Sequence, residues 1–379
     1  MKFIHLSDLH LGKRLNEYSL LEDQEFILKR ILAVIDEECP DGIIIAGDVY
    51  DKTVPPAEAV SLFDSFLVNL AKRSVKVFII SGNHDSAERL AFASKLIEQS
   101  GVHLSPVYDG TLQKITLSDT YGTVNVLLLP FIKPAHVRAF YPDEEIASYT
   151  DAVRVALKHA PIDISERNVL ITHQFITNSQ RSESEDISVG GTDNVDASVL
   201  EDFDYVALGH LHAPQSCNSQ KIRYCGTPLK YSFSESKDEK SVTVVTLEEK
   251  GSLSVRTIPL IPMRDLVELK GSYDDLMRKS FYENTSLRND YVHITLTDEE
   301  DVPDAIGKLR TVYKYLMKLD YENTRTRKEQ TFTDDIDVEK LSPKALFEEL
   351  FEVQNNKALT DEQSEMLAQL VESIWEEKT

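Results

Sequence analysis

The sequence predicts an α/β fold with a mainly parallel sheet, followed by a smaller α/β unit and C-terminal helices. Two observations carry this prediction. Over the N-terminal two-thirds, short apolar runs end abruptly in polar residues, and helical patterns at residues 22–38 and 57–73 separate the first three runs. Such alternation is typical of βαβ units, whose crossovers make successive strands parallel. From about Arg264 the order changes to strand, helix, strand, helix, strand, which indicates a separate unit.

The length and composition limit the class of protein. A chain of 379 residues exceeds the roughly 150 residues of a typical domain, and a charged content of 28% is in the globular range. Three cysteines without a CxxC pair favour a reducing compartment. The sequence has neither a signal-peptide core nor an apolar stretch of about 20 residues, so we expect a cytoplasmic protein without a membrane span.

The net charge of −23 argues against a polyanionic partner. The chain carries 41 Lys and Arg residues against 64 Asp and Glu residues, and such a chain repels nucleic acid as a whole. This objection weakens if positive charge is supplied where it is needed, by bound divalent cations, a local basic face or a basic partner subunit. The chemistry of the candidate site therefore decides between the alternatives.

Five predicted strands each deliver a polar loop. The strands cover residues 2–6, 43–46, 77–80, 169–171 and 205–208, and the loops after them cover residues 7–10, 47–48, 81–85, 172–173 and 209–212. In open α/β sheets, functional residues gather at the carboxyl ends of the strands. We therefore expect these loops to form one site.

The five loops carry imidazole, carboxylate and amide groups, which together resemble a metal site. Nitrogen and oxygen ligands without a thiolate suit Mn²⁺, Fe²⁺ or Zn²⁺, and seven ligands suit two metals if one carboxylate bridges them. Each fragment alone is ordinary loop chemistry, but coincidence is improbable for the whole ordered set. The candidate ligands are Asp8, His10, Asp48, Asn83, His173, His210 and His212. The histidines outside these loops are expected to be ordinary surface or core residues.

This series resembles the calcineurin-like binuclear metallophosphoesterases. Within them, the chain is similar to the family of nuclease subunits from bacterial SbcCD complexes, over about residues 1–260. The phrases that carry this resemblance are FIHLSDLHLGK, IAGDVYDKTVPP, SGNHDSAERL, GGTDNVDAS and ALGHLHAPQ. The resemblance implies a four-layer α/β/β/α core with two divalent metal ions, most readily Mn²⁺.

The resemblance also implies a role for each candidate ligand. One metal ion is expected on Asp8, His10, Asp48 and His212, and the other on Asp48, Asn83, His173 and His210. Asp48 is then the bridging ligand. Two cations about 3.5–4 Å apart clamp a phosphodiester and lower the pKa of a water molecule.

Four further residues are expected near the metals. By resemblance His84 stabilises the transition state or protonates the leaving oxygen, the alternative being a histidine that braces its loop. Asp51 and Asp85 are expected to orient imidazoles. Arg89 could meet a phosphate, and a surface ion pair is the alternative.

The resemblance and the order of elements together predict four parts. They are a nuclease core over residues 1–262, a DNA-recognising α/β cap over 263–330, an acidic linker over 331–341, and helices over 342–379. The C-terminal helices are amphipathic and acidic, and the resemblance implies that they bind an SbcC-like coiled-coil ATPase.

A helix predicted over residues 303–318 of the cap is the candidate DNA contact. Spacings of four residues place basic side chains on one face of this helix, and further basic residues follow it. The candidates are Arg310, Lys314, Lys318, Arg325 and Arg327. A solvated helix face without a DNA contact is the alternative.

Self-association is predicted from the helix at residues 57–73. Its apolar residues cover an arc wider than packing on one sheet requires, so we expect Leu62 and Phe66 to meet their symmetry mates across a two-fold axis, with a helix at 88–99. Burial under loops of the same chain is the alternative. The predicted assembly is a homodimer of this chain within a heterotetramer.

The sequence thus predicts a Mn²⁺-dependent DNA nuclease for end processing in repair, recombination and replication, with exonuclease action on duplex ends and endonuclease action on hairpins and single strands. A protein phosphatase or nucleotide phosphodiesterase with the same metals is the alternative enzyme. Against it, Asp51 is followed by Lys52 where phosphatases of this superfamily usually carry Arg-Gly. A scaffold with a vestigial metal site is a third possibility, but none of the seven ligands is missing.

Overall fold

The computed structural model describes residues 1–92, 94–105, 107–177, 179, 194–324 and 326, and in the C-terminal part residues 347–348, 351, 357–360, 362–367 and 370. The chain forms two compact units, the first ending at Asp265 and the second beginning at Leu266. This division lies close to the boundary after residue 262 that the sequence predicts.

The first sheet of the N-terminal unit has six strands in the order β16-β15-β1-β4-β5-β6. Strands β1, β4, β5 and β6 run parallel, and β15 and β16 are antiparallel additions at one side. Their bounds are β1 (Lys2–Leu6), β4 (Gly42–Ala46), β5 (Lys76–Ile80), β6 (Val102–Leu104), β15 (Ser241–Leu247) and β16 (Leu253–Pro259). Strand β4 is buried along its whole length, as expected for a parallel strand that is covered on both faces.

The second sheet has six strands in the order β13-β14-β12-β9-β8-β7, of which the inner four are parallel. Their bounds are β7 (Gln113–Asp119), β8 (Gly122–Leu129), β9 (Arg167–His173), β12 (Tyr205–Gly209), β13 (Gln215–Cys217) and β14 (Ser219–Tyr224). Two short pairs lie outside the sheets, β2 (Arg14–Leu15) with β3 (Tyr18–Ser19) and β10 (Phe175–Ile176) with β11 (Asn194–Val195).

The two sheets pack face to face around an apolar layer. Phe3, Ile44 and Phe78 project into this layer from the first sheet, and Val126 and Ile171 from the second. All five side chains are buried. The carboxyl ends of parallel strands from both sheets meet at a common edge, because His173 at the end of β9 lies 2.8 Å from the carbonyl oxygen of Ala46 at the end of β4.

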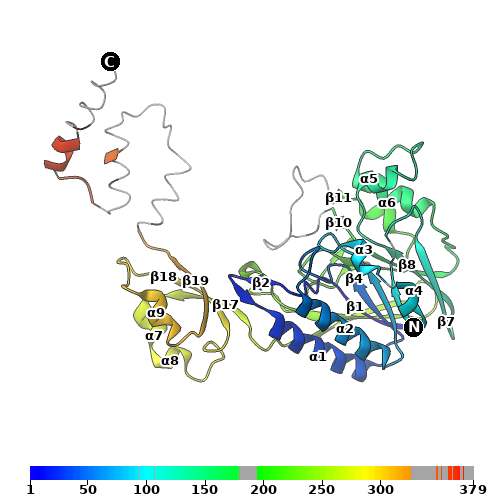
Figure 1. Ribbon diagram of the computed structural model, residues 1–379, viewed down its shortest axis with the longest axis horizontal. Helices are drawn as coiled ribbons and strands as arrows, with labels where there is room; N and C mark the ends of the chain where they lie inside the picture. The colour runs from blue at the N-terminus through cyan, green and yellow to red at the C-terminus, as the bar shows by residue number, and fades with distance from the viewer. Residues whose placement is uncertain are drawn as a thin grey trace, which may run out of the picture. The chain divides into compact units, whose positions relative to one another are not determined.

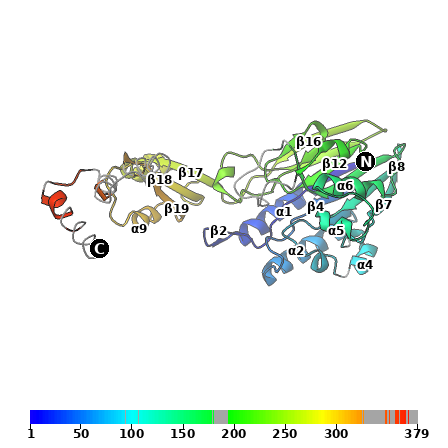
Figure 2. The same ribbon diagram turned by 90° about the horizontal axis from the view of Figure 1, so that it is seen from above.

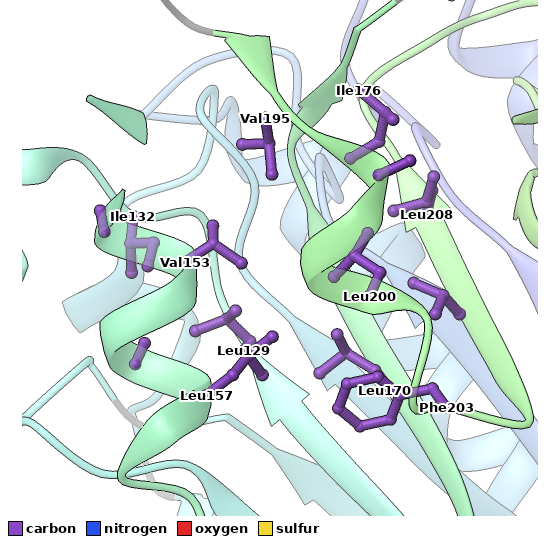
Figure 3. Packing of buried hydrophobic residues seen from close by; sticks show 14 of the residues in the cluster. Leu129, Ile132, Val153, Leu157, Leu170, Ile176, Val195, Leu200, Phe203 and Leu208 are labelled. Carbon is purple, nitrogen blue, oxygen red and sulfur yellow. The ribbon is translucent and has the colours of Figure 1, made fainter. Parts of the chain in front are cut away.

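Helices cover the outer faces of this sandwich. Helices α1 (Leu21–Glu38) and α2 (Ala57–Ala71) lie side by side on one side, and α5 (Pro134–Arg138) and α6 (Tyr149–Lys158) lie together on the other (Figures 1 and 2). Figure 3 shows Val153 and Leu157 of α6 facing Leu129 and Leu170 of the second sheet. The predicted four-layer α/β/β/α fold is confirmed.

Local sequence fixes the helix ends. Ser148 accepts a hydrogen bond from the main-chain N–H of Asp151, whose carboxylate accepts one from the N–H of Ser148, so α6 begins in a capping box.

The short helices are α3 (Ala87–Leu90) and α4 (Ser94–Ile97), with 3₁₀ turns η1 (Glu98–Ser100), η2 (Ala197–Leu200) and η3 (Phe233–Glu235). The single helix predicted at residues 88–99 is therefore wrong, and two short helices and a turn stand in its place.

The structure also corrects the prediction for Phe66. This side chain is 2% exposed and lines, with Leu62, a cavity of about 760 Å³ between α1 and α2. Phe66 is therefore buried within its own chain and offers almost no surface to a symmetry mate.

The second unit is a three-stranded parallel sheet with helices between its strands (Figure 1). The elements are β17 (Leu266–Gly271), α7 (Tyr273–Met277), α8 (Lys279–Tyr282), β18 (Tyr291–Leu296), α9 (Ala305–Arg310) and β19 (Tyr315–Tyr321). Its own core contains Leu276, Ile294, Leu309 and Tyr313, all essentially inaccessible to solvent.

The helix predicted over residues 303–318 is wrong. Helix α9 ends at Arg310, and β19 pairs with β18. Lys314 therefore lies between the two elements and Lys318 lies on the strand, so no helical basic stripe forms. Helical spacing in the sequence also fits four apolar residues of this segment, namely Leu309, Val312, Leu316 and Leu319. The pairing of β19 with β18 decides the structure after Tyr313 instead, and Leu316 is buried on the strand.

Several predicted features lie outside the described residues. They are Arg325, Arg327, the acidic linker at 331–341 and most of the C-terminal helices at 342–379. Residues 362–367 are described as helical, and Met366 is 67% exposed. None of the helices that the structure describes combines the length and the apolar character needed to traverse a lipid bilayer.

Candidate metal centre

The structure brings the seven predicted ligands together at the common edge of the two sheets. Their loops follow β1, β4 and β5 of the first sheet and β9 and β12 of the second. Nε2 of His173 lies 3.2 Å from Oδ2 of Asp48, and Oδ1 of Asn83 lies 3.0 Å from Nε2 of His173 and 3.0 Å from Nδ1 of His210. The remaining predicted ligands are Asp8, His10 and His212, which offer atoms within 4.8 Å of one another.

Asp48 occupies the middle of this arrangement. It belongs to one group of potential ligand atoms with Asp8 and His173, and to a second with His10 and His84. The main-chain N–H of His84 donates to its Oδ1 atom over 2.9 Å. This position suits a carboxylate that is shared between two cations.

His10 shows directly that the cluster suits a cation. The residue is 1% exposed, and both ring nitrogens are buried without a hydrogen-bond partner in the described part of the chain. Burial lowers the pKa of His10 well below its ordinary value, so the ring is neutral. A buried polar atom without a partner is costly, whereas a divalent cation bound to the imidazole satisfies it.

The backbone of the site is held in conformations that L-residues rarely adopt. Asp8, His10, Asp48 and His210 have φ angles of 52°, 43°, 49° and 103°. Main-chain hydrogen bonds enforce them, because the N–H of Asp8 donates to the carbonyl of Gly47 and the N–H of His10 to that of Asp48, both over 3.0 Å. Strained residues of this kind concentrate at functional sites, where the surrounding structure keeps the side chains in place.

Two glycines allow the loops to approach so closely. A Cβ atom on Gly82 would lie 2.1 Å from Oδ1 of Asp48, and one on Gly209 would lie 1.9 Å from the carbonyl oxygen of Ala46. Neither distance is compatible with a side chain. In Gly82-Asn83-His84 and in Gly209-His210, the glycine therefore lets the backbone approach closely, and the next residue is a predicted ligand.

Main-chain carbonyls orient two of the imidazoles. Nδ1 of His173 lies 2.8 Å from the carbonyl oxygen of Ala46, and Nδ1 of His84 lies 3.1 Å from that of Asp51. Because a carbonyl only accepts, each Nδ1 donates its hydrogen, and Nε2 is the ring nitrogen that remains for metal binding or proton transfer.

Asp51 and Asp85 have different surroundings. The Oδ1 atom of Asp51 lies 3.7 Å from Nδ1 of His10 and 2.9 Å from Nζ of Lys13. The carboxylate of Asp85 instead accepts main-chain N–H groups from Val49, Tyr50 and Gly82. Burial raises the pKa of Asp85 to about 6. Asp85 braces the loops, so the expectation that it orients an imidazole is wrong.

Arg89 lies at the surface. It is exposed on α3, where its main-chain N–H donates to Oγ of Ser86 over 3.4 Å. Its side chain forms no ion pair with any described residue, so the alternative of a surface ion pair has no support in that part of the chain.

Burial and neighbouring charges shift the pKa values of several groups in the cluster. Burial raises the pKa of Asp8. Burial also opposes ionisation of Asp48, but the neighbouring His173 holds its pKa below the ordinary value. Although burial favours a neutral imidazole, Asp48 raises the pKa of His173 to about 9. Two buried carboxylates among imidazole nitrogens form a mixed nitrogen and oxygen site that fits divalent metal ions.

Sequence reasoning missed the residues that support the ligands from behind. Gln24 of α1 donates to the carbonyl of His10 over 2.7 Å, and the hydroxyl of Tyr231 donates to the carbonyl of Leu9. Glu235 contacts the ring of His212. These residues belong to no motif and lie far in the sequence from their partners, so only the fold reveals them.

Comparisons with known proteins agree with this architecture. Residues 1–214 match the family model of the calcineurin-like phosphoesterases. Residues 262–355 match the model described as the Type 5 capsule protein repressor C-terminal domain.

Two curated relatives match over their full length. The SbcD subunit of the nuclease SbcCD from Staphylococcus epidermidis is 32% identical over 378 residues, which cover 99% of this chain and 99% of that protein. The protein of the same name from Staphylococcus saprophyticus is 32% identical over 389 residues, covering 100% and 99%. Among solved structures, a dimetal phosphatase from Danio rerio has a TM-score of 0.41 at 13% identity, covering 69% of this chain and 96% of that one. From the two full-length relatives and the matching core, the chain belongs to the calcineurin-like phosphoesterases and, among them, to the SbcD family of SbcCD nuclease subunits.

Proposed function

We propose that this chain is a metal-dependent DNA nuclease. The observation that carries the proposal is the convergence of six candidate nitrogen and oxygen ligands with Asp48, together with the imidazole of His10, which is buried and lacks any described hydrogen-bond partner. The full-length relatives are named as nuclease subunits, which favours DNA over a phosphoprotein or a free nucleotide. The phosphatase alternative is not favoured.

The donor set supports a two-metal arrangement. Asp8, His10 and His212 with Asp48 hold one cation, and Asn83, His173 and His210 with Asp48 hold the other. Seven protein ligands exceed the capacity of one ion, and the mixture of imidazole, carboxylate and amide suits Mn²⁺. When bound, the cations supply positive charge that polarises a phosphodiester and lowers the pKa of water.

His84 is the proposed proton-transfer residue. Its Nδ1 is engaged by the carbonyl of Asp51, and its main-chain N–H donates to Asp48, so the ring has a fixed direction at the edge of the cluster. We assign to its Nε2 atom the exchange of a proton with the leaving oxygen. The bonds that the chain hydrolyses are then phosphodiester bonds at duplex ends, in hairpins or in single strands.

A cavity of about 350 Å³ in the second unit is the proposed DNA contact. Arg288, Arg310 and Lys314 line it, and none of these three forms an ion pair with a carboxylate of the described residues. In contrast, Lys318 of the same unit pairs with Asp320 over 2.7 Å. Three cations left without carboxylate partners in so acidic a chain provide a local site for a backbone phosphate.

The proposed assembly contains two copies of this chain and a coiled-coil ATPase. The family membership supports an ATPase partner, which we assign to the amphipathic C-terminal helices at residues 342–379. Since Phe66 is buried, the surface proposed for a second copy shifts to exposed apolar side chains. These are Val60 and Val68 of α2, which are 43% and 44% exposed, and Phe92 and Leu96, which are 81% and 76% exposed.

A degradation assay on several substrates tests the proposed function. We expect the full chain to hydrolyse linear duplex DNA in the presence of Mn²⁺ and to be inactive in excess chelator. Phosphopeptide and cyclic nucleotide serve as competing substrates in the same buffer. Hydrolysis of either of these without hydrolysis of DNA would refute the nuclease proposal in favour of the phosphatase or phosphodiesterase alternative.

A further inference from the structure

The buried carboxylate of Glu235 lies behind the candidate metal centre and contacts His212. Glu235 ends the 3₁₀ turn η3 and is 1% exposed. Its Oε1 atom lies 3.1 Å from Nδ1 of His212. Because a carboxylate accepts, Nδ1 donates the hydrogen, and Nε2 becomes the ring atom that can bind a cation.

Lys240 completes this contact from the opposite side. Its Nζ atom lies 2.6 Å from Oε2 of Glu235 and donates to the main-chain carbonyl of His212 over 3.0 Å. The Lys240 side chain is also buried, at 3% exposure. His212 is therefore held twice, through its ring by Glu235 and through its backbone by Lys240.

The charges of the pair explain why both residues are needed. Asp8 and Asp48 already place two buried carboxylates at the centre. A third carboxylate without a counter-ion would be strongly unfavourable in this environment, and the ammonium group of Lys240 offsets it. The pair adds no net charge and can therefore remain buried beside the metal ligands.

The support of His212 differs in kind from that of the other oriented rings. His173 and His84 donate to main-chain carbonyls, whereas His212 donates to a full carboxylate. A carboxylate makes the imidazole a stronger electron-pair donor to a cation than a neutral carbonyl does.

We infer that Glu235 and Lys240 act together as a positioning pair for His212. The pair fixes the tautomer and direction of the ring and thereby sets the affinity for a divalent cation on the Asp8, His10 and His212 side of the centre. This inference rests on the proposed two-metal site and extends it to residues that themselves bind no metal.

Titration of the full, metal-free chain with Mn²⁺ tests the pair. In Glu235→Gln, we expect calorimetry and the Mn²⁺ electron paramagnetic resonance signal to report one site weakened by about 10- to 100-fold and the second site unchanged. At saturating Mn²⁺ its nuclease activity should recover, because His84 and its contact with Asp51 are untouched. The double variant Glu235→Gln with Lys240→Met removes both charges, so its folding does not depend on an uncompensated ammonium group, and the same loss is expected.

Asp238→Asn is the matched control. Asp238 lies 3.4 Å from Nζ of Lys240, and its replacement should leave both affinities unchanged. Wild-type affinity in the Glu235 variants would overturn the inference, and so would equal weakening of both sites, since that reports a general effect on the fold. A wild-type chain that binds no Mn²⁺ would instead refute the proposed two-metal function itself.

Discussion

Nε2 of His173 lies 3.2 Å from Oδ2 of Asp48, although the two residues follow strands of different sheets. His173 ends β9 of the second sheet, and Asp48 lies two residues beyond the end of β4 of the first. The pair therefore joins the sandwich at the edge where the candidate ligands collect. Any change that separates the sheets at this edge also separates the ligands.

Replacement of His84 should separate chemistry from metal binding. We expect His84→Ala to bind the same number of Mn²⁺ ions as the wild type and to lose about 10²- to 10⁴-fold in cleavage rate, because it loses a proton-transfer group and no ligand. Asp48→Ala should lose both metal binding and activity, because its carboxylate contacts both halves of the cluster. Metal content by mass spectrometry and single-turnover cleavage of labelled duplex DNA measure the two effects. Near-normal turnover by His84→Ala would remove the residue from the proposed mechanism.

Gly82→Ala should damage the site through a steric contact alone. The added Cβ would lie 2.1 Å from Oδ1 of Asp48, so the carboxylate or its loop must move. We expect Mn²⁺ affinity to fall by at least about tenfold, as for the loss of a ligand-orienting contact. Gly271→Ala is the control, because its Cβ meets Leu276 at an ordinary 3.4 Å. Equal metal affinity in the two variants would show that the close approach at Gly82 is unimportant.

His5 predicts how stability depends on pH. Burial and the nearby Arg223 lower the pKa of His5 to about 3, against about 6.5 in an unfolded chain. Between these values the unfolded chain binds a proton that the folded chain does not, so the free energy of unfolding falls as the pH falls from 6.5 towards 3.

His5→Gln removes this contribution while retaining a hydrogen-bonding group beside the hydroxyl of Tyr205, which lies 2.9 Å from Nδ1 of His5. Urea unfolding of the metal-free chains measures the free energy of unfolding at pH 7 and at pH 5. The decrease between these two pH values should be smaller by about 2 kcal/mol in the variant than in the wild type. Parallel pH dependences would mean that His5 titrates normally in the folded chain.

The basic cavity of the second unit predicts a salt dependence. Lys314→Ala should weaken DNA binding and reduce the slope of log K against log salt by about 1, as for the loss of one phosphate contact. Lys318→Ala serves as the control, because Lys318 is neutralised by Asp320. Binding is measured by fluorescence anisotropy with the full chain in chelator, which prevents cleavage. The same slope in the wild type and both variants would exclude a phosphate contact at Lys314.

The N-terminal part of this architecture could be predicted from sequence because each relevant signal is local. A buried run such as Ile43–Ile45 followed by Gly47-Asp48 specifies both a strand and the residue type at its end. The structure of residues 303–318 could not be predicted from local signals. Leu309, Val312 and Leu316 satisfy helical spacing, but the pairing of β19 with β18 determines where the helix ends. The contacts by which Gln24 and Glu235 support His10 and His212 join residues of different elements, and no residue spacing in the sequence predicts them.

Anomalous diffraction from crystals of the chain grown with Mn²⁺ tests the two-metal centre most directly. We expect two anomalous peaks about 3.5–4 Å apart, with the carboxylate of Asp48 between them. Asp8, His10 and His212 should surround one peak, and Asn83, His173 and His210 the other. A single peak, no peak, or two peaks that Asp48 does not bridge would contradict the proposed two-metal centre.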